Sequence, residues 1–164
     1  MKTKLLLFVM LFVLVVSVNA QTKDEKPFKI GVGATIGLPV GDMSDFYSLA
    51  FGVDLMGEYA VAPSFALTLS AGYVFFAKKS GVSINQDLIP VLAGVKYYFS
   101  DKLYGSAQAG ISVGTSSGSE SVFTFAPGVG YKVSDKFDLL LKYQSATKNS
   151  VDLSFLGLRA GYSF

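Results

Sequence analysis

Apolar and polar residues alternate along most of this chain. Between Phe28 and Val40 the even positions are Phe, Ile, Val, Ala or Leu, and the odd positions are Lys, Gly, Thr or Pro. A repeat of two residues is typical of a β-strand whose two faces meet different surroundings. The pattern predicts eight strands, at residues 28–40, 49–61, 65–76, 88–99, 103–113, 121–133, 136–146 and 153–164.

The two faces of the predicted strands differ in side-chain size and charge. One face carries bulky Phe, Tyr, Leu, Ile and Val and holds no charged residue in any segment. About half of the other face is Gly, Ala, Ser or Thr, which suits the narrow interior of a small barrel. The charged residues within the strands all fall on that second face: Lys29, Asp54, Glu58, Lys96, Lys132, Lys136, Asp138, Lys142 and Arg159.

Both a soluble barrel, such as a lipocalin, and a membrane barrel have one apolar and one polar face. The polar face of a soluble barrel meets solvent and is roughly 25–35% charged, whereas the polar face here has few charges and many small residues. The segments are also longer than strands of soluble sheets and match the ~9–11 tilted residues that cross a bilayer. The predicted fold class is therefore all-β: an eight-stranded antiparallel up-and-down transmembrane β-barrel, closed because backbone groups in lipid must be paired.

The predicted connections alternate in length. Short turns at 62–64, 100–102 and 134–135 lie at one end, and the longer connections 41–48, 77–87, 114–120 and 147–152 lie at the other. An even strand number places both termini with the short turns, at the periplasmic end of an exported barrel. The aromatic residues near that end predict a girdle at the level of the lipid headgroups: Phe28, Tyr59, Phe65, Phe99, Tyr131, Phe137, Tyr162 and Phe164.

Two prolines, Pro90 and Pro127, fall inside predicted strands. Proline has no N–H for the strand ladder, and a closed barrel has no free edge to accommodate it. We therefore predict a β-bulge at each proline.

The N-terminus has the pattern of a secretory signal peptide. A basic start at residues 1–4 precedes an apolar stretch, residues 5–16, and Val18 and Ala20 are compact residues at the positions that a signal peptidase reads. The alternative, a membrane anchor, needs ~20 apolar residues. We expect cleavage after Ala20, which divides the chain into a signal peptide (1–20), a short periplasmic segment (21–27) and the barrel (28–164).

Composition narrows the chemistry further. The chain is 51% hydrophobic but only 16% charged, below the roughly 25% of soluble domains. It contains no Cys and no His, which excludes thiolate and imidazole metal sites and the catalytic roles of both residues. We expect no cofactor, and the net charge of +2 without a basic run gives no indication of a nucleic-acid partner.

Several segments together resemble the small outer-membrane β-barrel family that includes OmpA- and OmpX-like barrel domains. They are the strand-turn-strand units YYFSDKLYGSAQAG and PGVGYKVSDKFDL and the ending FLGLRAGYSF. The resemblance implies residence in the outer membrane of a Gram-negative bacterium, a lipid environment, and assembly by the barrel-assembly machinery. It also implies a C-terminal assembly signal on one face of the last strand, formed by Leu158, Ala160, Tyr162 and Phe164.

Two acidic residues, Asp54 and Glu58, lie on the inward face of one predicted strand. Four strand residues separate them by about 13 Å, beyond the roughly 5–9.5 Å of glycosidase carboxylate pairs. We therefore expect an ionic network across the lumen rather than a catalytic pair. Its predicted members are Asp54, Glu58, Lys96, Lys132, Asp138, Lys142 and Arg159.

The inward face as a whole carries three acids and six bases, since Lys29 and Lys136 share its parity. This excess predicts a weak preference for anions if water passes through the lumen.

The outer loops are the other place for binding, because loops on a rigid scaffold commonly carry function. The first predicted loop places Asp42 and Asp45 beside Phe46 and Tyr47, which suggests a cation or surface-ligand site there. The simpler interpretation is a solvated turn with aromatic residues at the membrane interface.

Three functions remain open from the sequence. The leading hypothesis is a non-enzymatic outer-membrane barrel with a side-chain-filled lumen and a structural, cell-envelope or surface-interaction role. In this hypothesis the chain has no catalytic residues. The second is a narrow, porin-like channel for small or hydrophobic solutes. The third is a lipid-modifying barrel enzyme, which the resemblance disfavours because acyltransferase and deacylase barrels use His.

Overall fold

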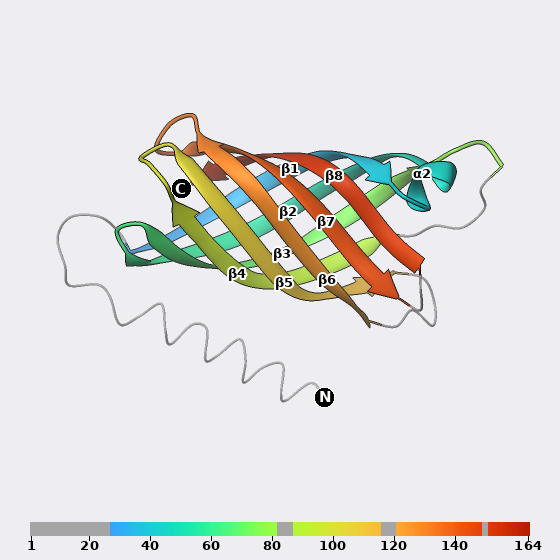
Figure 1. Ribbon diagram of the computed structural model, residues 1–164, viewed down its shortest axis with the longest axis horizontal. Coiled ribbons are helices and arrows are strands. Elements are labelled where there is room, and N and C mark those ends of the chain that lie inside the picture. Colours follow the sequence, from blue (N-terminus) through green and yellow to red (C-terminus); the bar gives the residue numbers. More distant parts are fainter. Residues whose placement is uncertain (1–26, 82–86, 116–120, 149–150) are drawn as a thin grey trace.

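The strands form a single closed barrel (Figure 1). The computed structural model describes residues 27–81, 87–115, 121–148 and 151–164. The strands are β1 Phe28–Val40, β2 Tyr47–Ala62, β3 Phe65–Lys78, β4 Leu88–Tyr98, β5 Leu103–Gly114, β6 Ser121–Lys132, β7 Phe137–Lys148 and β8 Val151–Ser163, with one short helix, α2 Met43–Phe46.

Each strand pairs antiparallel with its neighbour in the chain, and β1 closes the barrel against β8. This closing ladder runs from Gly31 opposite Ser163 to Val40 opposite Ser154. The predicted fold class is confirmed, and every strand lies within a few residues of the range that the alternation predicts. The predicted signal peptide and residues 21–26 of the predicted periplasmic segment lie outside the described residues.

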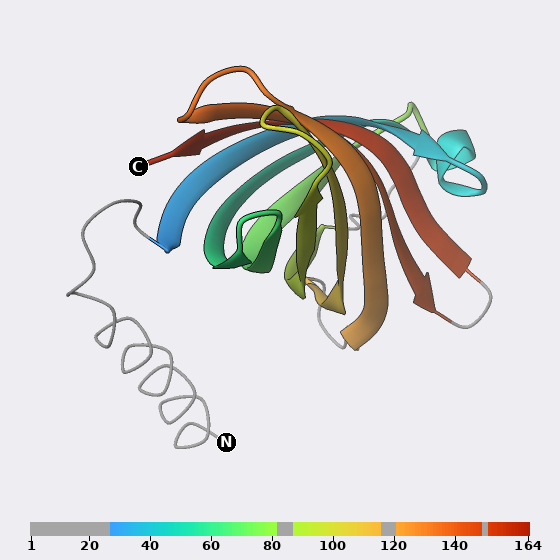
Figure 2. The same ribbon diagram turned by 60° about the vertical axis from the view of Figure 1, so that its left-hand side comes forward.

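The two ends of the barrel differ. The tight turns, the start of β1 and the C-terminus share one end, here called the turn end (Figure 2). Helix α2 lies at the opposite end, here called the loop end (Figure 1). Within the described ranges, no helix is long and apolar enough to span a membrane.

The outward face of the strands is apolar and exposed, as predicted. Its exposed side chains include Leu38, Val53, Leu55, Leu158 and Phe164. The charged side chains of Asp54, Glu58, Lys96, Lys142 and Arg159 instead lie inside the barrel, with Lys96 and Arg159 buried. Apolar surface of this extent is unfavourable in water and favourable in lipid.

Helix α2 was not predicted by the alternation, which indicated a loop at 41–48. Gly41 has φ +63°, a left-handed conformation that favours glycine. The turn is closed by the backbone N–H and the hydroxyl of Ser44, which both donate to the Gly41 carbonyl at 3.0 and 2.7 Å. A single turn of helix follows, and β2 starts at Tyr47, two residues earlier than predicted.

The predicted bulges at Pro90 and Pro127 are wrong. The β3–β4 register is the same on both sides of Pro90, and the β6–β7 register is the same on both sides of Pro127. Each ladder only omits the pairs at and beside the proline, while Pro90 and Pro127 keep their pairing with β5. The missing N–H therefore interrupts one neighbouring ladder locally and does not insert a residue. Register shifts occur instead near the ends of β2.

Candidate functional site

The interior of the barrel near the turn end is held by an ion cluster centred on Arg159 of β8. Its Nε donates to both carboxylate oxygens of Asp54 at 3.0 and 3.1 Å, and its Nη2 donates to Oδ2 at 2.7 Å. Asp138 of β7 lies on the other side, with its Oδ1 3.8 Å from Nη1. Gly33 faces this guanidinium, and a Cβ there would overlap it. The absent side chain therefore makes room for Arg159.

A second cluster is centred on the Glu58 carboxylate of β2. Lys96 Nζ donates to Oε2 at 2.8 Å, and the Tyr98 hydroxyl donates to Oε1 at 2.6 Å. Lys96 also lies 4.7 Å from the centre of the Tyr104 ring, whose hydroxyl donates to Asp138. Tyr104 thus joins the two clusters. Each described carboxylate in this part of the lumen has a charged or hydroxyl partner.

Two further lysines of the predicted network have no carboxylate partner within the described residues. Lys142 Nζ donates to Gln144 Oε1 at 3.1 Å. Lys132 lies over the Tyr98 ring, with Nζ 5.3 Å from its centre. The structure therefore brings Asp54, Asp138 and Arg159 together, brings Glu58 and Lys96 together, and leaves Lys132 and Lys142 to aromatic and amide contacts.

The predicted count of six inward bases needs correction. Lys29 and Lys136 are exposed at the turn-end mouth, because Lys29 is the second residue of β1 and Lys136 precedes β7. Lys96, Lys132, Lys142 and Arg159 remain in the lumen against three acids. The lumen is therefore closer to neutral than the parity count indicates.

A belt of hydroxyl and amide side chains lines the lumen from its middle, at Gln108, to the level of the loop-end strand residues Ser112 and Ser154. Gln108 Nε2 donates to Thr68 and Ser70, both at 3.2 Å. Ser112 and Thr124 share a hydrogen bond of 2.7 Å, and Ser154 donates to Ser145 at 2.9 Å. All of these residues are buried, and their mutual hydrogen bonds offset the cost of removing them from water.

An apolar cluster fills the lumen at the loop end. Its members are Met43, Tyr47, Ala50, Val74, Phe76, Leu88, Val122, Ala146 and Phe155. Phe76 packs edge-on against Phe155 and tilted against Tyr47, with ring centres 5.9 and 5.7 Å apart. Met43 enters from α2 and is only 3% exposed. The short helix therefore contributes directly to closing this end.

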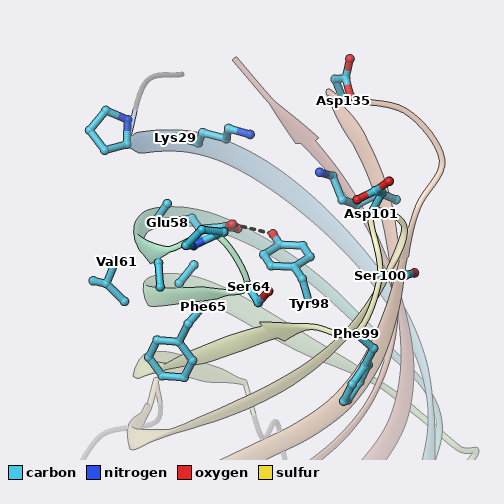
Figure 3. A pocket seen from close by; sticks show the side chains of 16 residues that line it. Lys29, Glu58, Val61, Ser64, Phe65, Tyr98, Phe99, Ser100, Asp101 and Asp135 are labelled. Atoms are coloured by element: carbon cyan, nitrogen blue, oxygen red, sulfur yellow. Dashed lines mark hydrogen bonds between the residues drawn. The ribbon is translucent and has the colours of Figure 1, made fainter. Parts of the chain in front are cut away.

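An open vestibule of about 660 Å³ occupies the turn-end mouth. Its walls include Lys29, Glu58, Tyr98, Lys132 and Asp135, as well as the rim residues of the tight turns. Figure 3 shows Lys29 reaching into the mouth from β1 and the hydrogen bond between Tyr98 and Glu58 at its floor. The same five residues also line a deeper space of only about 20 Å³. The vestibule thus narrows to about the size of one water molecule at the ion clusters.

The predicted loop site divides between two surroundings. Asp42, Asp45 and Phe46 are exposed at the loop end, whereas Tyr47 is 4% exposed and lies inside the barrel. A ligand at the loop surface can therefore meet the first three residues but not the Tyr47 ring. Within the part of the chain that the structure describes, no group of three or more acidic side chains is placed to hold a metal ion.

The residues of the predicted C-terminal assembly signal share one face. Leu158, Tyr162 and Phe164 are exposed on the outside of β8, with Ala160 half-buried between them. Tyr162 and Phe164 form an edge-on ring pair with centres 5.5 Å apart. The arrangement gives β8 a continuous apolar outer surface.

Sequence reasoning missed two contributions. The hydroxyls of Tyr98 and Tyr104 complete the ion clusters, and their inward parity among charged residues was the available signal. Met43 and Tyr47 close the loop end, for which the sequence held no signal because α2 was not predicted.

Comparison with known proteins points to one family. A family model described as "Outer membrane protein beta-barrel domain" matches residues 8–164. No curated protein matches the sequence.

Three solved structures illustrate the likeness in fold. The crystal structure of Ail, the attachment invasion locus protein of Yersinia pestis, has a TM-score of 0.59 at 18% identity, covering 84% of this chain and 97% of that chain. Neisserial surface protein A (NspA) gives 0.53 at 14% identity, covering 87% and 100%. A de novo designed transmembrane β-barrel gives 0.57 at 22% identity, covering 87% and 100%. A designed barrel matches about as well as the natural ones, so the likeness concerns architecture.

Proposed function

Because the chain belongs to the outer membrane protein beta-barrel domain family, we propose that it is a non-enzymatic outer-membrane protein with a side-chain-filled lumen. Its role in this proposal is structural support of the envelope or interaction at the cell surface. The observation that carries the proposal is that two different sets of side chains fill the lumen: the apolar cluster at the loop end and the ion clusters at the turn end.

The surface-interaction role also draws on the names of similar proteins. Ail is named an attachment invasion locus protein and has been solved in complex with the heparin analogue sucrose octasulfate, and NspA is named a surface protein. In the proposed orientation the loop end faces outward. Exposed Asp42, Asp45 and Phe46 then belong to the surface available to a partner.

Export and assembly complete the proposal. The first 20 residues act as a signal peptide cleaved after Ala20, residues 21–27 remain in the periplasm, and the apolar outer face of β8 serves as the assembly signal. The support is the sequence pattern at residues 1–20 and the exposure of Leu158, Tyr162 and Phe164 on one face.

The proposal that the protein is not an enzyme rests on the hydrogen bonds and ion pairs that the lumen carboxylates already form. Asp54 is bound by Arg159, and Glu58 by Lys96 and Tyr98. A carboxylate held in this way is a poor general base because its lone pairs are already engaged.

Lipid chemistry tests this part of the proposal. When the refolded protein is incubated with phospholipid and lipopolysaccharide, mass spectrometry should detect no change in the lipid composition. A new lipid product that disappears in Asp54→Asn or Glu58→Gln would overturn this part.

A narrow channel is the second candidate function, favoured by the polar belt of hydroxyl and amide side chains that lines part of the lumen. Single-channel conductance in planar lipid bilayers distinguishes the channel from the barrel with a filled lumen. The filled lumen predicts no steady single-channel current in a neutral salt solution. A steady current proportional to voltage would overturn the filled-lumen proposal and favour the channel.

A further inference from the structure

The outer face of the barrel has a hollow of about 540 Å³, here called the β4–β8 groove, across strands that lie side by side (Figure 1). Ala107 and Pro127 line it with small side chains, and the larger Tyr97 borders it. Ser106 and Lys142 also border it, but their side chains lie inside the barrel. The surface that the groove offers to lipid is therefore apolar and concave.

The groove extends from the turn end toward the middle of the barrel wall. At one end Tyr97 pairs with Gly105, one pair away from the last pair before the tight turn between β4 and β5. At the other end Leu156 lies one residue from the middle of β8. An acyl chain of the lipid leaflet at the turn end covers the same span, from the headgroup level to the centre of the bilayer.

Ring contacts hold the aromatic side chains that border the groove. Tyr97 packs edge-on against Phe99 with ring centres 5.3 Å apart, and Tyr143 packs tilted against Phe125 at 6.1 Å. Phe99 also covers Gly105, where a Cβ would lie 3.1 Å from the Phe99 Cζ. Because these rings are already packed, binding requires less ordering of side chains than it would in a flexible groove.

Lys102 supplies a positive charge at the turn-end edge of the groove. It lies in the turn between the strands of Tyr97 and Gly105, is exposed, and is not among the residues that line either space of the lumen mouth. Three residues separate it from Gly105, or ~10 Å of extended chain. A lysine stem can cover apolar surface while its ammonium group stays at the headgroup level.

A second hollow on the outer face, of about 650 Å³, differs in its charges. It reaches the turn end at Phe137 and Tyr162. Lys136, which precedes Phe137, and Lys29, near the start of β1, line the inner space of the lumen mouth instead. The two hollows are similar in size, so the charge at the turn end favours the β4–β8 groove for a lipid with an anionic headgroup.

We propose that the β4–β8 groove binds one glycerophospholipid, with an acyl chain between the aromatic side chains and its phosphate paired with Lys102. The choice of phospholipid rests on the proposed orientation, in which the turn end lies in the periplasmic leaflet. It does not depend on a surface role or on whether the lumen conducts. The volume of the groove falls within the roughly 300–1,000 Å³ of small-molecule sites.

Two lipids that differ in the phosphate test the proposal on the unchanged chain. Dioleoylphosphatidylglycerol and dioleoylglycerol have the same acyl chains, but only the first has a phosphate. Each would be titrated into the protein refolded in detergent, and native mass spectrometry would count the lipids retained. We expect saturation at one phosphatidylglycerol per chain and about tenfold weaker binding of dioleoylglycerol. Retention without saturation, or equal affinity for the two lipids, would overturn the proposal.

Filling the groove tests where the lipid binds. Ala107→Phe places a bulky side chain in the groove and should abolish saturable binding. Ala109→Phe is the matched control, because Ala109 is exposed on the same face of β5 two residues away and does not line the groove. It should leave the affinity unchanged. An equal loss in both variants, or a dimer without lipid as the main species, would contradict the assignment.

The headgroup contact has its own variant. Lys102→Gln should weaken the binding of phosphatidylglycerol by about tenfold and leave the binding of dioleoylglycerol unchanged. Lys136→Gln is the control, because Lys136 is an exposed lysine of another tight turn that lines the inner mouth. Unchanged binding of phosphatidylglycerol in Lys102→Gln, or the same loss in Lys136→Gln, would overturn the proposal.

Discussion

At the loop end the lumen is filled by Met43, Tyr47, Phe76 and Phe155, whereas at the turn end it is filled by Arg159, Lys96 and their carboxylate and hydroxyl partners. The apolar filling depends on shape, because each side chain only has to exclude voids. The ionic filling depends on complete pairing, because a charge left alone in the lumen is costly. The lumen of one barrel is thus filled by two kinds of interaction. The stability that each contributes should respond differently to mutation and to salt.

One filling side chain at the loop end, Met43, has a different source from the others. Arg159, Asp54, Glu58 and Lys96 all project from paired strands, so the barrel backbone fixes their positions. Met43 instead comes from α2, a four-residue helix outside the sheet. Tyr47, Phe76 and Phe155 project from strands in the same way, so it is the cavity left by a truncated Met43 that a shift of α2 can reduce.

Removing Arg159 should have the largest effect. In Arg159→Met, Asp54 and Asp138 stay in the lumen without their cation, and we expect a loss of about 3–5 kcal/mol in the free energy of unfolding. Urea unfolding in lipid vesicles measures it. The double variant Asp54→Leu/Arg159→Met should lose less than the two single variants together. If Arg159→Met costs less than about 1 kcal/mol, the Asp54–Arg159 pair contributes no more than an exposed salt bridge does. The proposed difference between the ionic turn end and the apolar loop end would then be contradicted.

Truncating Met43 should have a smaller effect. Met43→Ala removes a buried side chain from the apolar cluster, and we expect about 2 kcal/mol, the low end for this substitution, because α2 can shift inward. Phe46→Ala is the control within the same helix, since Phe46 is 52% exposed, and it should change stability by no more than about 0.5 kcal/mol. The Met43→Ala effect should not depend on salt. Equal losses in both variants would contradict a specific role for Met43.

The polar belt, tested at its loop-end pair Ser112 and Thr124, should give the smallest effect. Ser112→Ala leaves the Thr124 hydroxyl without its 2.7 Å partner and should cost about 1 kcal/mol. Adding Thr124→Val removes both polar groups, so the double variant should be no less stable than Ser112→Ala. The same unfolding measurement serves here. A double variant with a much lower free energy of unfolding than Ser112→Ala would contradict this prediction. It would show that the two hydroxyls stabilise the barrel by more than their hydrogen bond to each other.

The barrel could be predicted from the sequence because the alternation of apolar and polar residues is visible within each strand separately. The two-residue repeat of β1 separates Ile30, Val32 and Ile36 from glycines and Thr35 without knowledge of any neighbour. The structure places the first set outside and the second inside. Parity also placed Asp54, Glu58 and Arg159 in the lumen.

Partners within the lumen could not be predicted, because parity gives a face but not a depth or an angle around the barrel. Asp54 and Arg159 are 105 residues apart in the chain, and several lysines shared their face. Lys29 and Lys136 lie at the mouth because they are at strand ends, where a shift of one residue in the boundary changes their surroundings. The α2 helix depends on a local turn at Gly41, which a strand pattern does not reveal.

The central claim is the assignment of the bulky face to lipid and the polar face to the lumen, and an Arg at Leu69 tests it most directly. Leu69 is exposed on the outside of β3 and pairs with Ala93, the middle residue of β4. We expect Leu69→Arg to cost ~2–4 kcal/mol in lipid vesicles, and Val133→Arg, at the turn end, to cost only ~0–1 kcal/mol, because the cost falls toward the interface. Full stability of Leu69→Arg would contradict the assignment.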